Sequence, residues 1–382
     1  MTSIWAHAVA HAVAQAQVAT PESPAAADPS AEALQAVVRV SASALRTMSS
    51  SMVRIETIGG AQPAGSGKGG QGGGSRGPEF RQGDGPTTGV IWSADGYIVT
   101  SSFNFLRDPT VTTVTTFDER RFVARLIARD TPGRIALLKI DATNLSVASR
   151  APLAELKQGQ WVVAAGYGQG TGMPSPSLGI LSAAIRMNGM AVQTDAKISP
   201  ANYGGPLFDL DGRLIGICVP MGMSTDDIAG VDWYDSGIGF ATRTDRIDRH
   251  FEKMRGGRSV ERGLLGVTLE PDDLKPRSAT QSAGPRGLRV AGDPRGPAIA
   301  AGMLKGDLIV ELDGQPTPRL VDLRRALWAW GAGDTVRVRY VRDGEDRGCE
   351  ITLATADELS ARDETPTSRP ADSQPADPIP RR

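Results

Sequence analysis

The sequence predicts a mainly β protein, in which a barrel or sandwich of short strands precedes a smaller unit of strands and helices. Over residues 89–242, short apolar runs alternate with turn residues such as Asp211-Gly212, and no helical periodicity separates the runs. The composition agrees, because glycine and proline number 45 and 26 while aromatic residues make up 5%. A chain of 382 residues has room for two or three domains.

The N-terminal 27 residues are alanine-rich and allow two interpretations. They are either a degraded signal peptide, with Ala14-Gln15-Ala16 as a cleavage-like triplet, or a disordered tail. Asp28-Pro29 then indicates the start of a helix, so we expect the first domain to cover residues 28–257. No run of about 18 apolar residues occurs, and we therefore expect no membrane span.

Short strands are expected along this first domain, closed by a helix. Residues 59–88 interrupt them with a glycine-rich polar stretch, which we interpret as a surface loop because it lacks the fixed spacing of a phosphate-binding loop. The expected strands lie in 52–58, 89–103, 110–130, 135–140, 160–167, 178–186, 191–195, 206–219 and 236–242, and the helix in 243–254.

A second domain is expected over residues 258–356. It begins with a strand at 263–269 and continues over 287–353 as strand, short helix, strand, turn, helix and two strands. Residues 357–382 are charged and rich in proline, which predicts a disordered tail.

Charge and cysteine content exclude several classes of function. A formal net charge of −1 gives no overall attraction to nucleic acid or to a membrane surface, so neither is expected as a partner. Cys218 and Cys349 are the only cysteines and lie far apart in sequence, which excludes a disulfide framework and a cysteine metal site. We expect no metal and no cofactor.

Several motifs together resemble the HtrA/Deg-type serine proteases over about residues 50–356. The resemblance implies a chymotrypsin-like double β-barrel followed by a PDZ domain, serine endopeptidase ancestry, trimeric assembly and a location outside the cytoplasm. The motifs are ADGYIVT (94–100), IALLKI (135–140), GQWVVAAG (159–166), GGPLFDLDGRLIGI (204–217) and GIGFAT (237–242), followed by the PDZ-like GLLGVTL (263–269) and GPAIAAGMLKGDLIVELDG (296–314).

The catalytic residues that the resemblance implies are substituted in this chain. Phe103 stands at the histidine position, Arg134 at the aspartate position and Tyr203 at the serine position. In the loop that would shape the oxyanion hole, the equivalent residues are Ala201 and Asn202. A serine nucleophile needs a base within hydrogen-bond reach and an acceptor that orients the base. With none of the three roles filled, we expect no intact catalytic site.

Alternatives to an inactive site stay open at this point. Ser199, Ser101 or Ser102 is a candidate for a displaced nucleophile, and Tyr203 for a phenolic one, although its ordinary pKa lies near 10. Outside the N-terminal tail the only histidine is His250, which either swings in as a base or is an exposed residue of the closing helix.

The three substituted residues also lead to a structural hypothesis. Because their counterparts converge in the family, we expect Phe103, Arg134 and Tyr203 to meet. Two aromatic rings with a guanidinium above them would form a cation–π cluster that fills the former site. The alternative is three unrelated side chains that point to solvent.

In the second domain, the resemblance to PDZ domains implies a peptide-binding groove. Its carboxylate-binding loop would be Gly263-Leu264-Leu265-Gly266, followed by a strand that starts at Val267. Leu323 and Leu327 would form the opposite wall, and Leu265 is either a groove residue or a core residue. With no charged residue in 263–269, we expect a preference for an apolar C-terminal side chain.

These residues together favour an inactive HtrA-like protein that binds peptide C-termini or unfolded protein segments, in quality control or scaffolding. Two alternatives stay open: a serine-type endopeptidase with a relocated catalytic group, and a regulatory subunit of an active homologue. We accordingly expect either a homo-trimer or a hetero-oligomer with such a homologue. The expected location is periplasmic or exported, and otherwise cytoplasmic.

Overall fold

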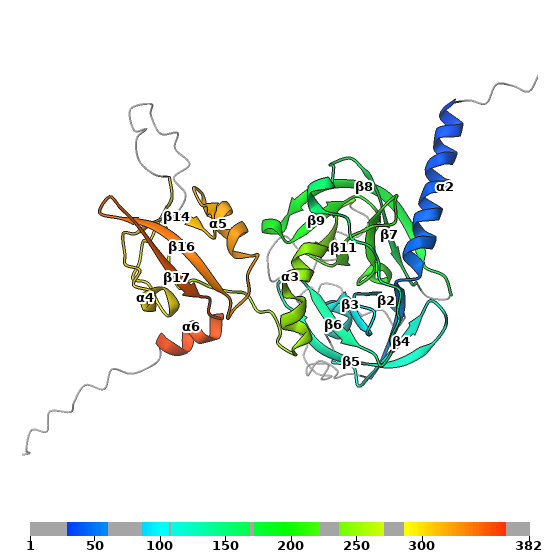
Figure 1. Ribbon diagram of the computed structural model, residues 1–382, viewed down its shortest axis with the longest axis horizontal. Helices are drawn as coiled ribbons and strands as arrows, with labels where there is room; N and C mark the ends of the chain where they lie inside the picture. Colours follow the sequence, from blue (N-terminus) through cyan, green and yellow to red (C-terminus); the bar gives the residue numbers. More distant parts are fainter. Residues whose placement is uncertain are drawn as a thin grey trace, which may run out of the picture. The chain divides into compact units, whose positions relative to one another are not determined.

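The computed structural model describes residues 29–59, 86–106, 108–168, 172–221, 237–270 and 286–363. The chain divides into two compact units, residues 1–42 and 43–382. Helix α2 (Pro29–Ser49) starts in the first unit and ends in the second (Figure 1). The glycine-rich stretch predicted as a loop and the N-terminal tail lie almost wholly outside the described residues. No described helix is long and apolar enough to cross a membrane.

The first part of the second unit is a closed six-stranded barrel with the strand order β1-β2-β3-β6-β5-β4. All its pairings are antiparallel, as expected for neighbouring strands joined by short turns. The strands are β1 (Met52–Ile58), β2 (Thr87–Ile91), β3 (Tyr97–Ser101), β4 (Val111–Thr116), β5 (Arg121–Asp130) and β6 (Ile135–Lys139).

A second closed barrel has the order β10-β11-β12-β9-β8-β7, and helix α3 (Thr244–Arg255) follows it. The predicted Asp211-Gly212 turn joins β10 to β11, where Gly212 adopts a φ of 75° and donates its N–H to the Asp209 carbonyl. The strands are β7 (Trp161–Gly166), β8 (Ser175–Arg186), β9 (Ala191–Thr194), β10 (Pro206–Asp209), β11 (Leu214–Val219) and β12 (Gly239–Arg243).

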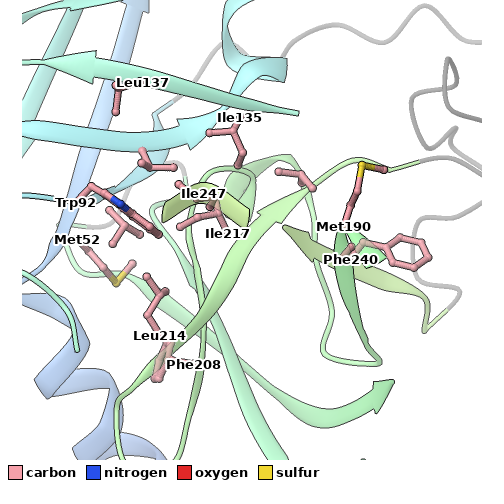
Figure 2. Packing of buried hydrophobic residues seen from close by; sticks show 14 of the residues in the cluster. Met52, Trp92, Ile135, Leu137, Met190, Phe208, Leu214, Ile217, Phe240 and Ile247 are labelled. Atoms are coloured by element: carbon pink, nitrogen blue, oxygen red, sulfur yellow. The ribbon is translucent and has the colours of Figure 1, made fainter. Parts of the chain in front are cut away.

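A shared hydrophobic core joins the two barrels. Ile135 and Leu137 come from the first barrel, Phe208 and Ile217 from the second, and all belong to one buried cluster (Figure 2). Alternating strand residues supply this core, because successive side chains point to opposite faces.

The C-terminal part is a separate sheet with its own core. The predicted order of strand, short helix, strand, helix and two strands is observed, so the mainly β class, with two barrels and a PDZ-like unit, is confirmed. The elements are β13 (Leu288–Arg289), α4 (Pro297–Ala300), β14 (Leu308–Leu312), β15 (Gln315–Pro316), α5 (Leu320–Leu327), β16 (Thr335–Arg342), β17 (Glu345–Thr352) and α6 (Ala356–Asp363).

Helix α6 corrects the expectation of a disordered tail from residue 357. The Thr355 hydroxyl accepts the N–H of Glu358, and the Glu358 carboxylate accepts the N–H of Thr355, a reciprocal capping box. Leu359 also reaches the backbone near Gly296, where an added Cβ would lie 2.5 Å from its Cδ2. A cap and one apolar contact therefore order a segment whose composition alone predicts disorder.

A buried ion pair links three parts of the second unit. Asp130 at the end of β5 is 0% exposed, and Arg246 on α3 is 5% exposed. Arg246 donates Nε to Asp130 Oδ2 (3.0 Å) and Nη2 to Oδ1 (2.9 Å), while Nη1 donates to the backbone carbonyl of Trp328. Asp130 also accepts the N–H of Gly133 at 3.0 Å. The charges are therefore fully hydrogen-bonded, as burial requires.

Removal of one partner of this pair should destabilise the protein strongly. In Asp130→Ala, the buried Arg246 charge loses its carboxylate, and we expect the free energy of unfolding to fall by about 3–5 kcal/mol. Asp141→Ala is the matched control, because it breaks the exposed Arg125–Asp141 pair and should cost less than about 1 kcal/mol. Urea titration followed by tryptophan fluorescence measures both; equal losses in the two variants would refute the structural role of the buried pair.

Candidate functional site

Phe103 and Tyr203, which replace the expected histidine and serine, lie in contact. Phe103 belongs to the 3₁₀ turn η1 (Ser102–Phe105) after β3, and Tyr203 follows the 3₁₀ turn η4 (Pro200–Asn202) before β10. Their ring centroids are 5.3 Å apart with planes inclined by 75°, an edge-to-face geometry. Only 6% and 5% of their surfaces are exposed, so the two rings occupy a buried space.

The backbone of Arg134 lies beside the same turn. Its carbonyl accepts the N–H of Ser102 at 2.8 Å, and its own N–H donates to the Thr131 carbonyl at 3.2 Å. Arg134 adopts a φ of 57°, a left-handed conformation that is uncommon outside glycine. The aromatic half of the expected cluster is thus present, and the guanidinium above the rings stays a prediction.

The loop that precedes β10 has its backbone amides committed to internal hydrogen bonds. The N–H groups of Asn202 and Tyr203 donate to the carbonyls of Ser199 (2.8 Å) and Pro200 (3.2 Å), which closes η4. Those of Gly204 and Gly205 donate to the carbonyls of Cys218 (2.8 Å) and Asn202 (2.8 Å). An oxyanion hole needs N–H groups that point to the reacting oxygen. In this conformation all four successive N–H groups already donate to carbonyls, so none points to a reacting oxygen.

The remaining atoms of this loop are held by the first barrel. The carbonyl of Ala201 accepts the Thr88 hydroxyl at 3.1 Å, and the carbonyl of Tyr203 accepts Asn104 Nδ2 at 3.3 Å. Gly204 has a φ of 87°, and a Cβ there would come within 2.1 Å of Thr100 Oγ1. Because Gly204 has no side chain, its backbone can lie directly against β2 and β3.

Two of the three candidate displaced nucleophiles, Ser199 and Ser101, have hydroxyls that form hydrogen bonds within their own loops. The Ser199 hydroxyl donates to Asn202 Oδ1 at 3.1 Å. Ser101 is fully buried and its hydroxyl accepts the N–H of Phe103 at 3.3 Å, while the N–H of Ser102 is bonded to Arg134. Neither of the two hydroxyls with a recorded partner, Ser199 and Ser101, is bonded to a base.

His250 does not provide a base. The alternative that it is an exposed helical residue is wrong, because it is only 2% exposed on α3. Burial, and next the positive charge of Arg246, lowers the pKa of the His250 imidazole to about 4, which makes the buried ring a weak proton acceptor. It is the sole histidine within the described ranges.

The described residues offer neither a reactive thiol nor a group of metal ligands at this site. Cys218 on β11 is buried, and burial raises the pKa of its thiol to about 12, which leaves almost no thiolate at pH 7. No group of three His, Cys, Asp or Glu side chains in the described segments could hold a metal ion.

In the C-terminal part, the strand predicted at 263–269 is not formed. Leu264 and Leu269 instead make isolated β-bridges to Ala354 and Val290, and the extended backbone around Val267 is hydrogen-bonded on one side. The Thr268 carbonyl accepts the N–H of Ala291 at 2.8 Å, and the N–H of Glu270 donates to the Arg289 carbonyl at 2.9 Å. Because alternate residues of a strand point their polar groups to opposite sides, Val267 and Leu269 present theirs to the other edge. There they form no backbone hydrogen bond with any described residue.

The loop before this extended segment is closely held. Leu264 and Ala354 exchange two backbone hydrogen bonds of 2.8 and 3.1 Å, and the Gly266 carbonyl accepts the N–H of Arg295 at 2.7 Å. Gly266 needs its φ of 84°, and a Cβ there would lie 2.1 Å from the Arg295 carbonyl oxygen.

The apolar residues of the expected groove divide into two sets. Leu265 (4% exposed) and Leu323 (3%) are buried in the core of this part, with Gly263 beside them. Val267 on the extended segment and Leu327 on α5 are partly exposed and border the same core. A bound peptide would therefore contact Val267 and Leu327 directly, while Leu265 supports them from below.

Comparison with known proteins agrees with this architecture. Residues 87–217 match the trypsin-like peptidase domain family, and residues 263–353 match the PDZ domain family. The chain is similar to proteins named DegP-like. The probable periplasmic serine endoprotease DegP-like of Halomonas elongata is 34% identical over 272 residues, which cover 70% of this chain and 56% of that protein. A second protein of that name, from Pseudomonas fluorescens, is 33% identical over 289 residues, with 74% and 59% covered.

Solved structures support the same likeness. The chain is similar to the HtrA-type protease AlgW with tripeptide, with a TM-score of 0.60 and 25% identity over 82% of this chain and 96% of that one. The serine endoprotease from Yersinia pestis gives a TM-score of 0.55 at 26% identity, covering 81% and 96%. The chain spans less than two thirds of the length of the curated relatives it matches.

The sequence located the substituted positions of this chain but did not reveal the closed amides. Pro200, at the first position of η4, was the one available signal, because proline favours the start of a helical turn. The support given by Asn104 and Thr88 depends on residues far away in sequence and has no local signature.

The contact between Phe103 and Tyr203 predicts a measurable coupling. Phe103→Leu and Tyr203→Leu should each lower the free energy of unfolding, and the double variant should lose about 0.5–1.5 kcal/mol less than their sum. Pairing Phe103→Leu with Val123→Ala on the exposed face of β5 serves as the control, which should be additive within about 0.5 kcal/mol. Additivity of the aromatic pair, measured by urea denaturation, would contradict the contact.

Proposed function

We propose that this chain is catalytically inactive and binds peptide C-termini or unfolded segments through its PDZ domain. The buried contact between Phe103 and Tyr203 supports the proposed inactivity, because these residues stand where a nucleophile and its base would be needed. The unpaired side of the extended backbone at Val267 supports peptide binding.

Loss of each catalytic role has its own physical cause. Phe103 cannot accept a proton, and Arg134 carries a positive charge where an imidazolium would need a negative one. The amides around Tyr203 already donate to backbone carbonyls, so stabilisation of an oxyanion is also missing. Restoring one side chain would therefore leave the other requirements unmet.

Peptide binding by strand addition needs an extended edge with free amides and carbonyls, and side pockets beside it. Val267 and Leu269 offer such an edge, and Leu327 on α5 offers an apolar contact. The solved relative AlgW was obtained with a tripeptide, which fits a peptide ligand for this chain as well. Because residues 263–269 carry no charge, the preferred C-terminal residue is apolar.

The curated relatives are named periplasmic, and we extend that location to this chain as part of the proposal. In that compartment an inactive peptide-binding chain would act in protein quality control, either as a holder of unfolded segments or beside an active homologue.

Inactivity is tested with a fluorophosphonate probe, which labels activated serines. We expect no labelling and no cleavage of casein by this chain, with an active DegP-like protease as the positive control. The triple variant Phe103→His, Arg134→Asp, Tyr203→Ser should stay at least about 100-fold below that control, because the η4 amides remain committed. Labelling of the unaltered chain that disappears in Ser199→Ala or Ser101→Ala would overturn the proposal.

Peptide binding is tested with a fluorescein-labelled peptide that ends in valine, titrated with the full chain. Amidation of the peptide C-terminus should weaken binding about tenfold or more, because a charge-assisted hydrogen bond is lost. Leu327→Ala should also weaken binding, whereas Val321→Ala, exposed on the same helix, should not. Equal anisotropy curves for the acid and amide peptides would exclude capture of a C-terminal carboxylate.

A further inference from the structure

A second concave site lies away from the substituted catalytic positions. It is a cavity of about 290 Å³ formed by α3, α5, the turn between β14 and β15, and the 3₁₀ turn η3 (Met187–Gly189). Its volume is at the lower end of the range for small-molecule sites, roughly 300–1,000 Å³. The cavity is therefore large enough for a small ion or one side chain of a partner.

Four arginines line this cavity, and two of them are already neutralised. Arg243 forms an ion pair with Asp245, which also lines the cavity, and Arg246 forms the buried pair with Asp130. These two arginines help to shape the walls, because Arg243 also donates Nη1 to the Gly189 carbonyl at 2.7 Å.

The other two arginines, Arg249 and Arg325, have no carboxylate within 4.0 Å among the residues that the structure describes. The Arg249 guanidinium lies 5.0 Å from the ring centroid of Trp330, a stacking that orients it. Arg325 passes close to Gly189, where an added Cβ would lie 3.3 Å from its Cγ. Trp330 and Gly189 thus position the two arginines, and neither of these uncharged neighbours neutralises the positive charge.

The remaining acidic residue in the lining, Asp313, does not cancel both charges. Its carboxylate accepts the backbone N–H of Arg337 at 2.9 Å. After the two ion pairs are subtracted, Arg249 and Arg325 face one carboxylate, so the cavity keeps an excess of positive charge. The side-chain amides of Asn188 and Gln315 add neutral donors to the lining.

We propose that this cavity binds an oxyanion, a carboxylate or a phosphate, between Arg249 and Arg325. Guanidinium groups match both anions in geometry and form strong charge-assisted hydrogen bonds with them. The site is distinct from the proposed peptide groove, because residue 325 points about 160° away from residues 323 and 327 on α5. It does not depend on the proposed function.

Binding at this site has a structural consequence. Arg249 belongs to the helix that closes the second barrel, and Arg325 belongs to the PDZ domain. An anion held by both would connect the two domains and add to the contact that Arg246 makes with Trp328.

The test is isothermal titration calorimetry on the full chain at low salt, with inorganic phosphate and with an acetylated, amidated triglutamate as separate probes. Blocking both peptide ends prevents capture of a terminal carboxylate by the PDZ groove. We expect at least one probe to bind, and Arg325→Gln and Arg249→Gln each to weaken it about tenfold or more. Arg324→Gln, an exposed neighbour on α5 that does not line the cavity, is the matched control and should bind as the unaltered chain does.

The outcomes separate the source of the anion from the existence of the site. Binding of phosphate alone supports a free phosphate or phosphoryl ligand, and tighter binding of triglutamate supports an acidic protein segment. No binding of either probe up to roughly 10 mM overturns the proposal. Equal weakening by Arg324→Gln, or no weakening by Arg249→Gln in a variant with an unchanged melting temperature, overturns it as well.

Discussion

The ion pair between Asp130 and Arg246 is the interaction on which the architecture around α3 depends. One guanidinium bonds to the end of a strand in the first barrel, belongs to the helix after the second barrel and donates to Trp328 near the C-terminal sheet. Such a pair is costly to desolvate, and it is tolerated only because every polar atom has a partner. The hydrogen bonds of this ion pair are directional, whereas a purely hydrophobic contact would let the joined elements shift relative to one another.

The packing around Phe103 and Tyr203 differs from what a catalytic site requires. Catalysis needs polar groups that are held ready but unsatisfied until the substrate arrives, and that readiness costs stability. Around Tyr203 the amides are bonded, the rings fill the space and the glycine loop rests on Thr88 and Thr100. In this chain the loop is therefore stabilised by ordinary packing and backbone hydrogen bonds.

Much of the fold was predictable from the sequence because local signals agreed with one another. The Asp211-Gly212 turn and the short apolar runs indicate strands, and motif spacing places Phe103 and Tyr203 at equivalent positions in two loops. The burial of His250 was not predictable, because it depends on strands β5 and β11, which pack against α3 but are distant in sequence. Helix α6 was missed because one capping box at Thr355 outweighs a disorder-prone composition.

If a peptide binds as proposed, the short open backbone edge at Val267 limits how many of its residues can be recognised. Only Val267 and Leu269 direct their polar groups outward on this edge, and two alternate residues span about 7 Å of strand. A bound peptide would pair with this edge over roughly three residues, which is too few for recognition of a long sequence. A domain with so short an edge would select peptides by their C-terminal residues and would accept different sequences further upstream. An edge this short also gives neighbouring copies little template for pairing, which protects the exposed segment from aggregation.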